Sequence, residues 1–100
     1  MLSPSSVPEL ARILSFLGNE QRLNILRAIA GEEMFAREIS EKVGISRPLV
    51  AIYLKQLEHE GLVIGSNRIS EEPPYLRRYY RALPFELMID LPLITVIKEV

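Results

Sequence analysis

The sequence predicts a mainly α-helical fold with one small β-hairpin, in the α+β class. Apolar residues recur at helical spacing in several segments between residues 7 and 60, and glycines separate these segments. After Gly61 the pattern changes to two runs rich in β-branched and aromatic residues, at 62–69 and 75–83. The polar stretch 70–74 between them contains prolines, which fit the tip of a hairpin because they cannot donate ladder hydrogen bonds.

Length and composition limit the classes of protein to consider. The chain has 100 residues, and we expect residues 1–100 to form a single domain. It contains no cysteine, which excludes disulfides and thiolate chemistry. The start of the chain lacks the features of a signal peptide, and no segment reaches the roughly 18 uninterrupted apolar residues of a membrane span. We therefore expect a cytoplasmic protein that does not contact a membrane.

The charge of the chain is close to balanced but unevenly distributed. The net charge of −1 and the pI of about 5.8 do not favour a simple electrostatic binder of nucleic acid. Between Phe35 and Arg81, however, eight basic residues outnumber six acidic ones. The basic excess thus coincides with the motif described below.

The first helix is predicted at residues 7–17. Ser6 and Glu9 have the spacing of a capping box, in which each side chain bonds to the other residue's backbone N–H. Ile13 and Phe16 widen the apolar stripe of this helix beyond one narrow face. We therefore expect the helix to be buried on two sides, by the core of its own domain and by something else.

The second helix is predicted at residues 20–30, with Asn19 as its N-cap and Gly31 at its end. Its inward face is expected to contain Leu23, Leu26 and Ile29–Ala30. Residues 32–35 form a short link that could be extended.

A helix-turn-helix is predicted at residues 36–60. The first of its helices stops at Gly44, which can adopt the positive φ that ends a helix. Ser46 can cap the second helix, and Pro48 fits its first turn. A residue before proline resists the α conformation, so a start at Pro48, with Arg47 as the boundary, stays open.

The second helix of this motif has two distinct faces. Val50, Leu54 and Leu57 recur at i, i+4 and i+7, so they share one face and can anchor the helix to a core. A helix that presents its opposite face to solvent fits the major groove of DNA. The candidate DNA contacts in this region are Ser46, Arg47, Pro48, Ala51, Ile52 and Lys55.

Three helices followed by a hairpin make a winged helix, in which residues 62–83 form the wing. Arg77 and Arg78 are candidate contacts to phosphates or to the minor groove. Adjacent side chains of a strand point to opposite faces, so only one of the two is expected to face DNA. Glu71 and Glu72 at the tip would repel phosphate, which suggests that the tip is either held away from the DNA backbone or tuned by it.

The segment 84–100 is the least polar part of the chain. Pro92 makes one long helix unfavourable, so we expect a turn followed by a terminal helix. Leaving a Leu or Ile side chain in water costs about 1.5–3 kcal/mol, and contiguous apolar patches mark interfaces. We therefore expect this segment and the first helix to form the interface of a homodimer, and its candidate residues are Leu10, Ile13, Phe16, Leu87, Leu91, Ile94 and Ile97.

Three stretches resemble the ArsR-type winged helix-turn-helix regulators. L-G-N-E-Q-R-L-N-I-L-R-A-I at Leu17–Ile29 is similar to their L-(G/S)-(D/N)-x-x-R-L-x-I-L opening. I-S-R-P-L-V-A-I-Y-L-K-Q-L-E-H-E-G-L-V at Ile45–Val63 resembles their recognition helix, and R-R-Y-Y-R-A at Arg77–Ala82 resembles their second wing strand. The resemblance covers roughly residues 10–83. It implies a homodimeric regulator of transcription that binds double-stranded DNA, usually as a repressor, and that dimerises through its first and last helices.

The resemblance does not imply that this chain senses metals. Relatives that sense metals have a C-x-C motif where this chain has Phe35 and Arg37, and His59 is the only histidine. We therefore expect no metal and no cofactor, and the sequence identifies no small-molecule effector. Ala51 and Ile52 stand where relatives often have Ser and His, which leaves fewer polar groups for the edges of bases.

The main prediction is a sequence-specific, DNA-binding transcriptional regulator that acts as a homodimer, with the 46–60 helix in the major groove. Two alternatives stay open, because the near-neutral charge and the apolar residues of that helix suit them as well. One is a winged helix used for contact between proteins, and the other is an architectural DNA-binding protein without strong sequence specificity. An enzyme is not expected, since the sequence has no phosphate-binding glycine loop, no Ser/His/Asp set and no metal cluster.

Overall fold

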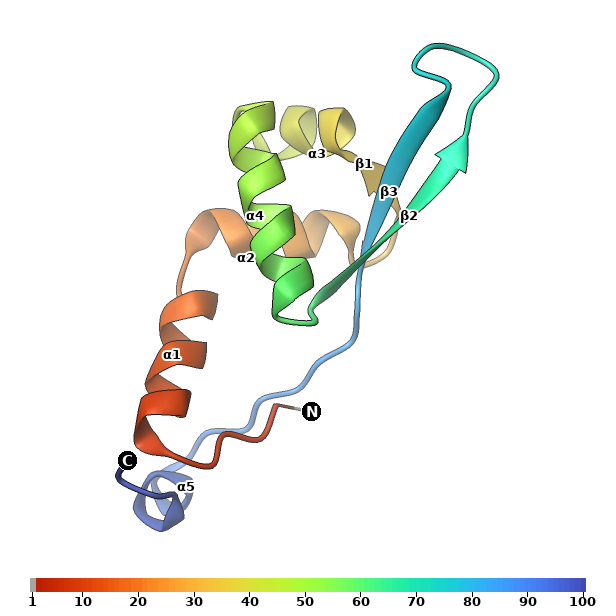
Figure 1. Ribbon diagram of the computed structural model, residues 1–100. Coiled ribbons are helices and arrows are strands. Elements are labelled where there is room, and N and C mark those ends of the chain that lie inside the picture. The colour runs from red at the N-terminus through yellow and green to blue at the C-terminus, as the bar shows by residue number, and fades with distance from the viewer. Residues whose placement is uncertain (1) are drawn as a thin grey trace. The chain divides into compact units, whose positions relative to one another are not determined.

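The computed structural model describes residues 2–100 and contains five α-helices and three β-strands in that range (Figure 1). This confirms a mainly helical fold with a small antiparallel sheet. In chain order the elements are α1 (Val7–Leu17), α2 (Glu20–Ile29), β1 (Met34–Phe35), α3 (Ala36–Val43), α4 (Arg47–His59), β2 (Val63–Ile69), β3 (Leu76–Ala82) and α5 (Leu91–Val96). The chain divides into two compact units, one of residues 20–83 and one made of its two ends. The single domain expected for residues 1–100 stays a prediction.

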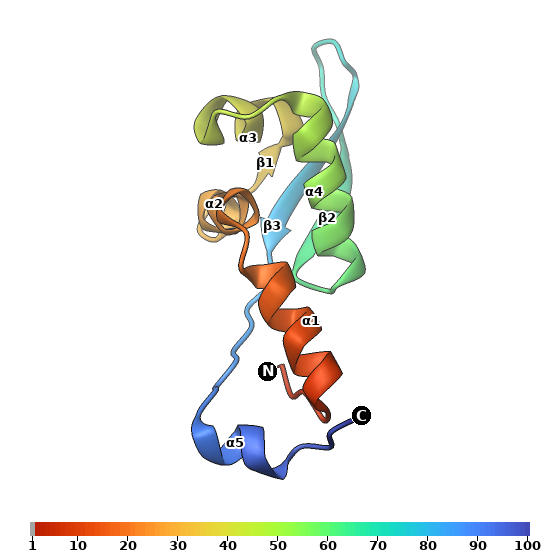
Figure 2. The ribbon, with the colours of Figure 1, turned by 90° about the vertical axis from the view of Figure 1, so that its left-hand side faces the viewer.

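The unit of residues 20–83 has a helical core formed by α2, α3 and α4, with the sheet beside it (Figure 2). The side chains with almost no exposure belong to these three helices: Ile25, Ile29, Ile39, Val50, Leu54 and Leu57.

The inward face predicted for α2 is partly wrong. Ile25 and Ala28 are buried there, while Leu23 is 47% exposed. Leu26 and Ile29 do face inward, as predicted. The buried face of α2 therefore consists of Ile25, Leu26, Ala28 and Ile29.

Local capping fixes the turn between α3 and α4. Gly44 has a φ of 74°, the left-handed conformation that glycine adopts without strain, and its N–H donates to Ser40 O at 2.9 Å. The side chain of Ser46 accepts a hydrogen bond from Leu49 N at 3.3 Å, and the helix begins at Arg47. Gly44 and Ser46 therefore have the roles that the sequence predicts, and Pro48 lies within the first turn.

The sheet contains a strand that the sequence did not specify. Its order is β1–β3–β2, and both pairings are antiparallel. The hairpin of β2 and β3 was predicted, whereas β1 falls in the link for which an extended conformation was only one option. Met34 of β1 is 6% exposed and lies opposite Tyr80 of β3. A strand of two residues is too short to show a period of two in the sequence.

The other unit brings the two ends of the chain together. Val7 N donates to Lys98 O at 2.7 Å, and Lys98 N donates to Ser5 O at 3.1 Å. Ser6 caps α1 by accepting a hydrogen bond from Glu9 N at 3.2 Å. The Glu9 carboxylate accepts hydrogen bonds from the backbone N–H and the hydroxyl of Ser5, not from Ser6, and these bonds lower the pKa of Glu9.

The terminal helix is present but short. α5 has six residues and begins after Asp90, whose side chain accepts a hydrogen bond from Leu93 N at 2.9 Å. Pro92 lies in the first turn of this helix, where its missing N–H costs nothing. None of the helices within residues 2–100 is both long enough and apolar enough to cross a membrane.

Candidate nucleic-acid interface

The face of α4 predicted to contact DNA is open to solvent. Val50, Leu54 and Leu57 are at most 1% exposed, so they fix which side of the helix packs against the core. Ile52 is 54% exposed, which shows that it is not a core residue. The candidate contacts Ser46, Arg47, Pro48, Ala51, Ile52 and Lys55 are all exposed.

Besides its apolar packing against the core, α4 is held in place by polar contacts with α2. Tyr53 donates its hydroxyl hydrogen to Gln21 Oε1 at 2.6 Å, and Arg22 Nη1 donates to Gln56 Oε1 at 3.0 Å. The Arg22 guanidinium also lies 5.5 Å from the centre of the Tyr53 ring. These pairs are more than 30 positions apart in the chain, so no local pattern could have revealed them.

Arg78 of the wing is directed toward α4. Its Nη2 atom donates to Glu58 Oε2 at 2.9 Å and its Nη1 atom to Asn67 Oδ1 at 3.4 Å, and the bond to Glu58 raises the pKa of Arg78. Tyr80 lies below the same guanidinium, and burial, followed by the Glu58 carboxylate, raises the pKa of Tyr80. Arg78 was a candidate DNA contact, but in this structure its guanidinium connects the wing to α4.

Gly65 provides the space through which Arg78 reaches Glu58. A Cβ atom at position 65 would lie 2.6 Å from Nε of Arg78. We expect Gly65→Ala to displace this side chain, to break the ion pair with Glu58 and to lower the Tm slightly. Thermal unfolding of Gly65→Ala, Glu58→Gln and the double variant measures how far the effect of one substitution on stability depends on the other. The effect of Gly65→Ala should vanish in the Glu58→Gln background, whereas additive effects would show that Gly65→Ala does not act through this ion pair.

The opposite face of the sheet contains Arg77 and the aromatic residues Phe35 and Tyr79. Arg77 and Arg78 therefore lie on different faces, as the alternation along a strand requires. The rings of Phe35 and Tyr79 pack edge to face with centroids 5.5 Å apart, so Tyr79 has a packing role. On this face Glu33 forms an ion pair with Arg68 and lies 3.9 Å from Arg81.

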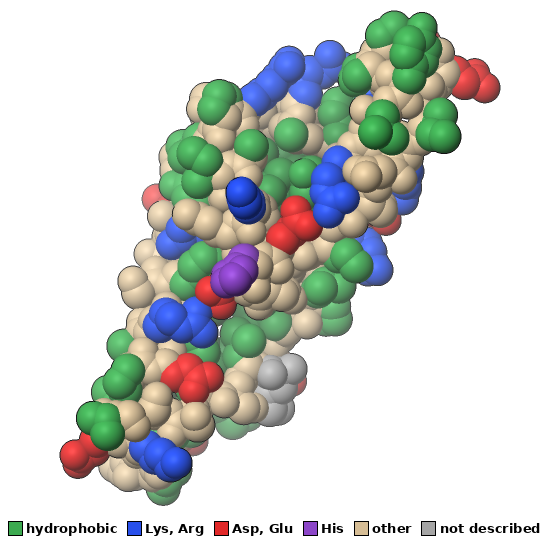
Figure 3. Space-filling view, viewed as in Figure 1, with side chains coloured by type: hydrophobic (Ala, Val, Ile, Leu, Met, Phe, Trp, Pro, Cys, Tyr) green, Lys and Arg blue, Asp and Glu red, His purple; other side chains and the backbone are tan. Residues whose placement is uncertain are grey.

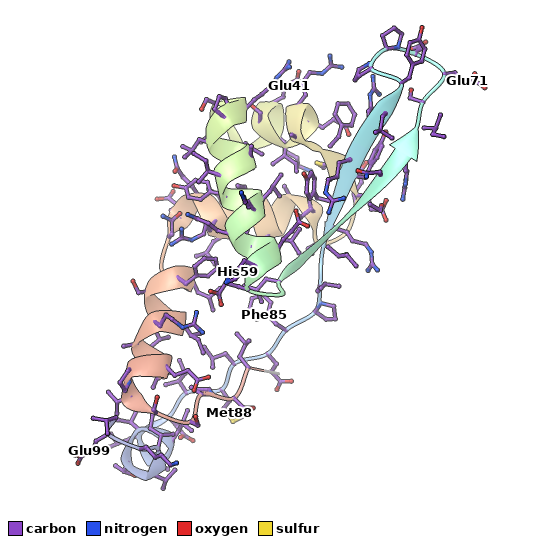
Figure 4. All side chains as sticks on the ribbon, viewed as in Figure 1. Glu41, His59, Glu71, Phe85, Met88 and Glu99 are labelled. Carbon is purple, nitrogen blue, oxygen red and sulfur yellow. The ribbon has the colours of Figure 1, made fainter. Side chains whose placement is uncertain are left out.

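Basic and acidic side chains alternate over α4 and the wing on the face seen in Figure 3. Glu71 projects into solvent from the wing tip, and His59 lies at the end of α4 (Figure 4). The wing tip also exposes apolar surface, since Ile69 is 90% and Tyr75 is 64% exposed. Among residues 2–100, no three His, Cys, Asp or Glu side chains are grouped so that they could hold a metal ion.

The candidate dimer residues differ in how much surface they offer. Leu10 and Ile13 are 6% and 8% exposed, so a single chain already buries them. Phe16, Leu87 and Ile97 are half-buried. Leu91 and Ile94 of α5 are 71% and 45% exposed and offer the largest area in this set. The sequence analysis did not select Val7, Leu14 and Met88, which are also exposed.

An open α4 face, a three-residue turn before it and a hairpin after it define a winged helix-turn-helix protein. Residues 19–64 match the family model described as "Bacterial regulatory protein, arsR family". The comparison with curated proteins found no match.

Solved structures agree with this family. A possible transcriptional regulatory protein from Mycobacterium bovis is 30% identical, with a TM-score of 0.58 over 73% of this chain and 72% of that one. A solution structure from the same organism, described as a homodimeric winged helix-turn-helix DNA-binding domain of a possible ArsR-family regulator, is 30% identical, with a TM-score of 0.57 over 73% of this chain and 62% of that one. The chain belongs to the arsR family and is a DNA-binding transcriptional regulator of the winged-helix type.

The repressor BigR from Xylella fastidiosa shares the fold. It is 23% identical, with a TM-score of 0.64 over 79% of this chain and 72% of that one.

Proposed function

We propose that this regulator is a homodimeric repressor that binds specific sequences in double-stranded DNA. α4 enters the major groove in this proposal, and the β2–β3 hairpin follows the adjacent backbone. The observation that carries the proposal is the exposed face of α4, since its buried residues fix the orientation of the helix. The homodimeric DNA-binding domain from M. bovis supports both the partner and the assembly.

The residues of the exposed α4 face suit different parts of the duplex. Arg47 lies at the start of the helix, the end that reaches base edges in related docking geometries, and a guanidinium can bond to guanine with two hydrogen bonds. Ile52 can contact the methyl group of thymine. Lys55 lies two turns further along and suits a phosphate. In a dimer with two such helices, the half-sites should lie about 34–36 Å apart.

Selection of bound duplexes from a random library, followed by sequencing, tests whether the protein prefers particular sequences. With the selected duplex, we expect Arg47→Ala to weaken binding by about 1–3 kcal/mol and to relax the preference at one base. Lys55→Ala should reduce the slope of log affinity against log salt by about 0.9. Fluorescence anisotropy over a range of KCl concentrations measures both effects.

Arg27→Ala is the matched control, because Arg27 is an exposed arginine in the last turn of α2, outside the α4 face. It removes the same charge and should leave the sequence preference unchanged. A wild-type salt slope near zero would contradict binding to DNA and favour a protein partner. Equal affinity for selected and random duplexes would favour an architectural role, which the apolar Ala51 and Ile52 would suit.

A further inference from the structure

A cleft of about 290 Å³ opens beside the wing, where the start of β3 lies near the N-terminal ends of α3 and α4, within the unit of residues 20–83. The start of α3 contributes Arg37 to its lining, the start of α4 contributes Arg47, and β3 contributes Arg77 and Arg78. None of the described residues that line the cleft is acidic. Arg78 forms an ion pair with Glu58, so the other three arginines are the ones whose charge can bind a ligand.

Aromatic stacking holds two of these arginines in place. The Arg77 guanidinium lies 4.6 Å from the centre of the Phe35 ring, and the Arg37 guanidinium lies 5.6 Å from the same ring. Stacking fixes the position of a cation without neutralising its charge. The ring therefore keeps two positive charges next to one cleft.

The hydrogen-bonding capacity of these arginines is largely unused. Arg77 Nη2 donates to Pro73 O at 3.4 Å, while its Nε is buried and has no partner among the described residues. Among residues 2–100, the one ion pair of Arg37 is a 3.9 Å contact with Glu41, and it is weak because both side chains are at least half exposed. Within residues 2–100, Arg47 has no ion-pair or side-chain hydrogen-bond partner.

Like charges held together in a cleft favour a ligand of opposite charge. The planar guanidinium forms paired hydrogen bonds to tetrahedral oxyanions, and phosphate is the partner that best fits this geometry. The site also lies between the wing and the N-terminal end of α4, beside the helix proposed to enter the groove. A phosphate of the duplex backbone could thus reach it while α4 is bound.

We propose that the cleft binds one phosphate group of the DNA backbone through Arg37 and Arg77, while Arg47 at its edge makes the base contact proposed above. This inference rests on the proposed function, and it adds Arg37 and Phe35 to the DNA-binding surface. The contact sets the position of the wing relative to α4 but does not distinguish one base from another. Arg78, which also lines the cleft, connects the same wing to Glu58 of α4.

The test compares Arg37→Ala, Arg77→Ala and Phe35→Leu with the wild-type protein by anisotropy. Arg37→Ala should weaken binding roughly tenfold, by a similar factor for selected and random duplexes, and reduce the salt slope by about 0.9. Phe35→Leu removes the stacking ring but no charge, and it should weaken binding by a smaller factor. Arg68→Ala is the control, because Arg68 also lies over an aromatic ring of the wing but is paired with Glu33 and does not line the cleft.

The outcomes separate this site from the proposed function. Unchanged affinity and salt slope in both Arg37→Ala and Arg77→Ala, with losses in Arg47→Ala and Lys55→Ala, would overturn the cleft as a phosphate site and leave the regulator intact. No loss in any of the four variants would overturn the proposed function itself.

A second measurement distinguishes backbone phosphate from a free anion. Inorganic phosphate is titrated into the wild-type protein while the Arg77 Nε–H signal is followed by NMR. Binding only at tens of millimolar supports a site that needs the duplex. Binding below about 1 mM that is lost in Arg37→Ala and displaces DNA would show that the cleft serves a free anion, and would overturn the assignment to the backbone.

Discussion

Leu57→Ala is expected to lower the free energy of unfolding by about 2–5 kcal/mol, the usual cost of a cavity left by a buried leucine. Leu57 is 0% exposed and belongs to the three residues that dock α4 on the core. Domains of this size are stable by only about 5–15 kcal/mol, so the variant loses a large share of its stability. Chemical denaturation followed by circular dichroism measures the change, and DNA binding should weaken in parallel at temperatures where the variant unfolds.

Ile52→Ala is the matched control for this prediction. It removes a similar side chain from the same helix, but Ile52 is 54% exposed. It should change the free energy of unfolding by less than about 1 kcal/mol, within the usual range for surface positions and partly offset by the higher helix propensity of alanine. Equal destabilisation by the two substitutions would show that α4 does not present the face assigned to it.

The double substitution Leu91→Asp and Ile94→Asp is expected to separate the proposed dimer into monomers. Both side chains are exposed in the single chain, so the fold should be retained. In a symmetric interface each position occurs twice. If each contact contributes even half of the usual 1.5–3 kcal/mol, the loss is on the order of 3–6 kcal/mol, or about 10²–10⁴ in the dimer Kd.

Light scattering coupled to gel filtration measures the mass of the variant over a range of concentrations. Ile69→Asp is the control, since it introduces one such charge at an apolar residue that is 90% exposed on the wing tip. A double variant that stays dimeric would show that α5 is not part of the interface. A wild-type chain that is monomeric at micromolar concentration would remove the dimer from the proposed function.

The helix-turn-helix could be predicted in detail because its determinants are local. Gly44 and Ser46 act within four residues of their own position, and the spacing of Val50, Leu54 and Leu57 defines one face of a helix. The same local information predicted that the opposite face would be exposed. It also gave the hairpin, because β-branched and aromatic runs on either side of a proline-containing turn leave few other arrangements.

The contacts that connect these elements could not be predicted. Met34 is buried because β1 pairs with β3, more than 40 residues further along the chain. Alternation along the strand separated Arg77 from Arg78, but nothing local indicated that Arg78 would meet Glu58 and that Arg77 would stack on Phe35. The candidate DNA contact at Arg78 came from its neighbourhood of basic residues, which does not reveal a distant carboxylate.

The inward face of α2 shows the same limit within one helix. Leu23 and Ile25 are both apolar, and only the position of the neighbouring helices decides that Ile25 is buried and Leu23 is not. Leu10 and Ile13 were assigned to an interface because α1 seemed too apolar for one partner. The single chain already covers these two side chains, and Val7 and Leu14 are the apolar residues of α1 that stay exposed.

The wing is fastened at two places: β1 pairs with the outer edge of β3, and Arg78 of β3 passes over Gly65 to reach Glu58 of α4. A hairpin held in this way keeps a fixed spacing between the wing and α4. A fixed spacing favours duplexes whose groove already has a matching width, because any other duplex must deform and the deformation costs free energy. Operators would then be selected in part by their stiffness and shape, at base pairs that no side chain touches.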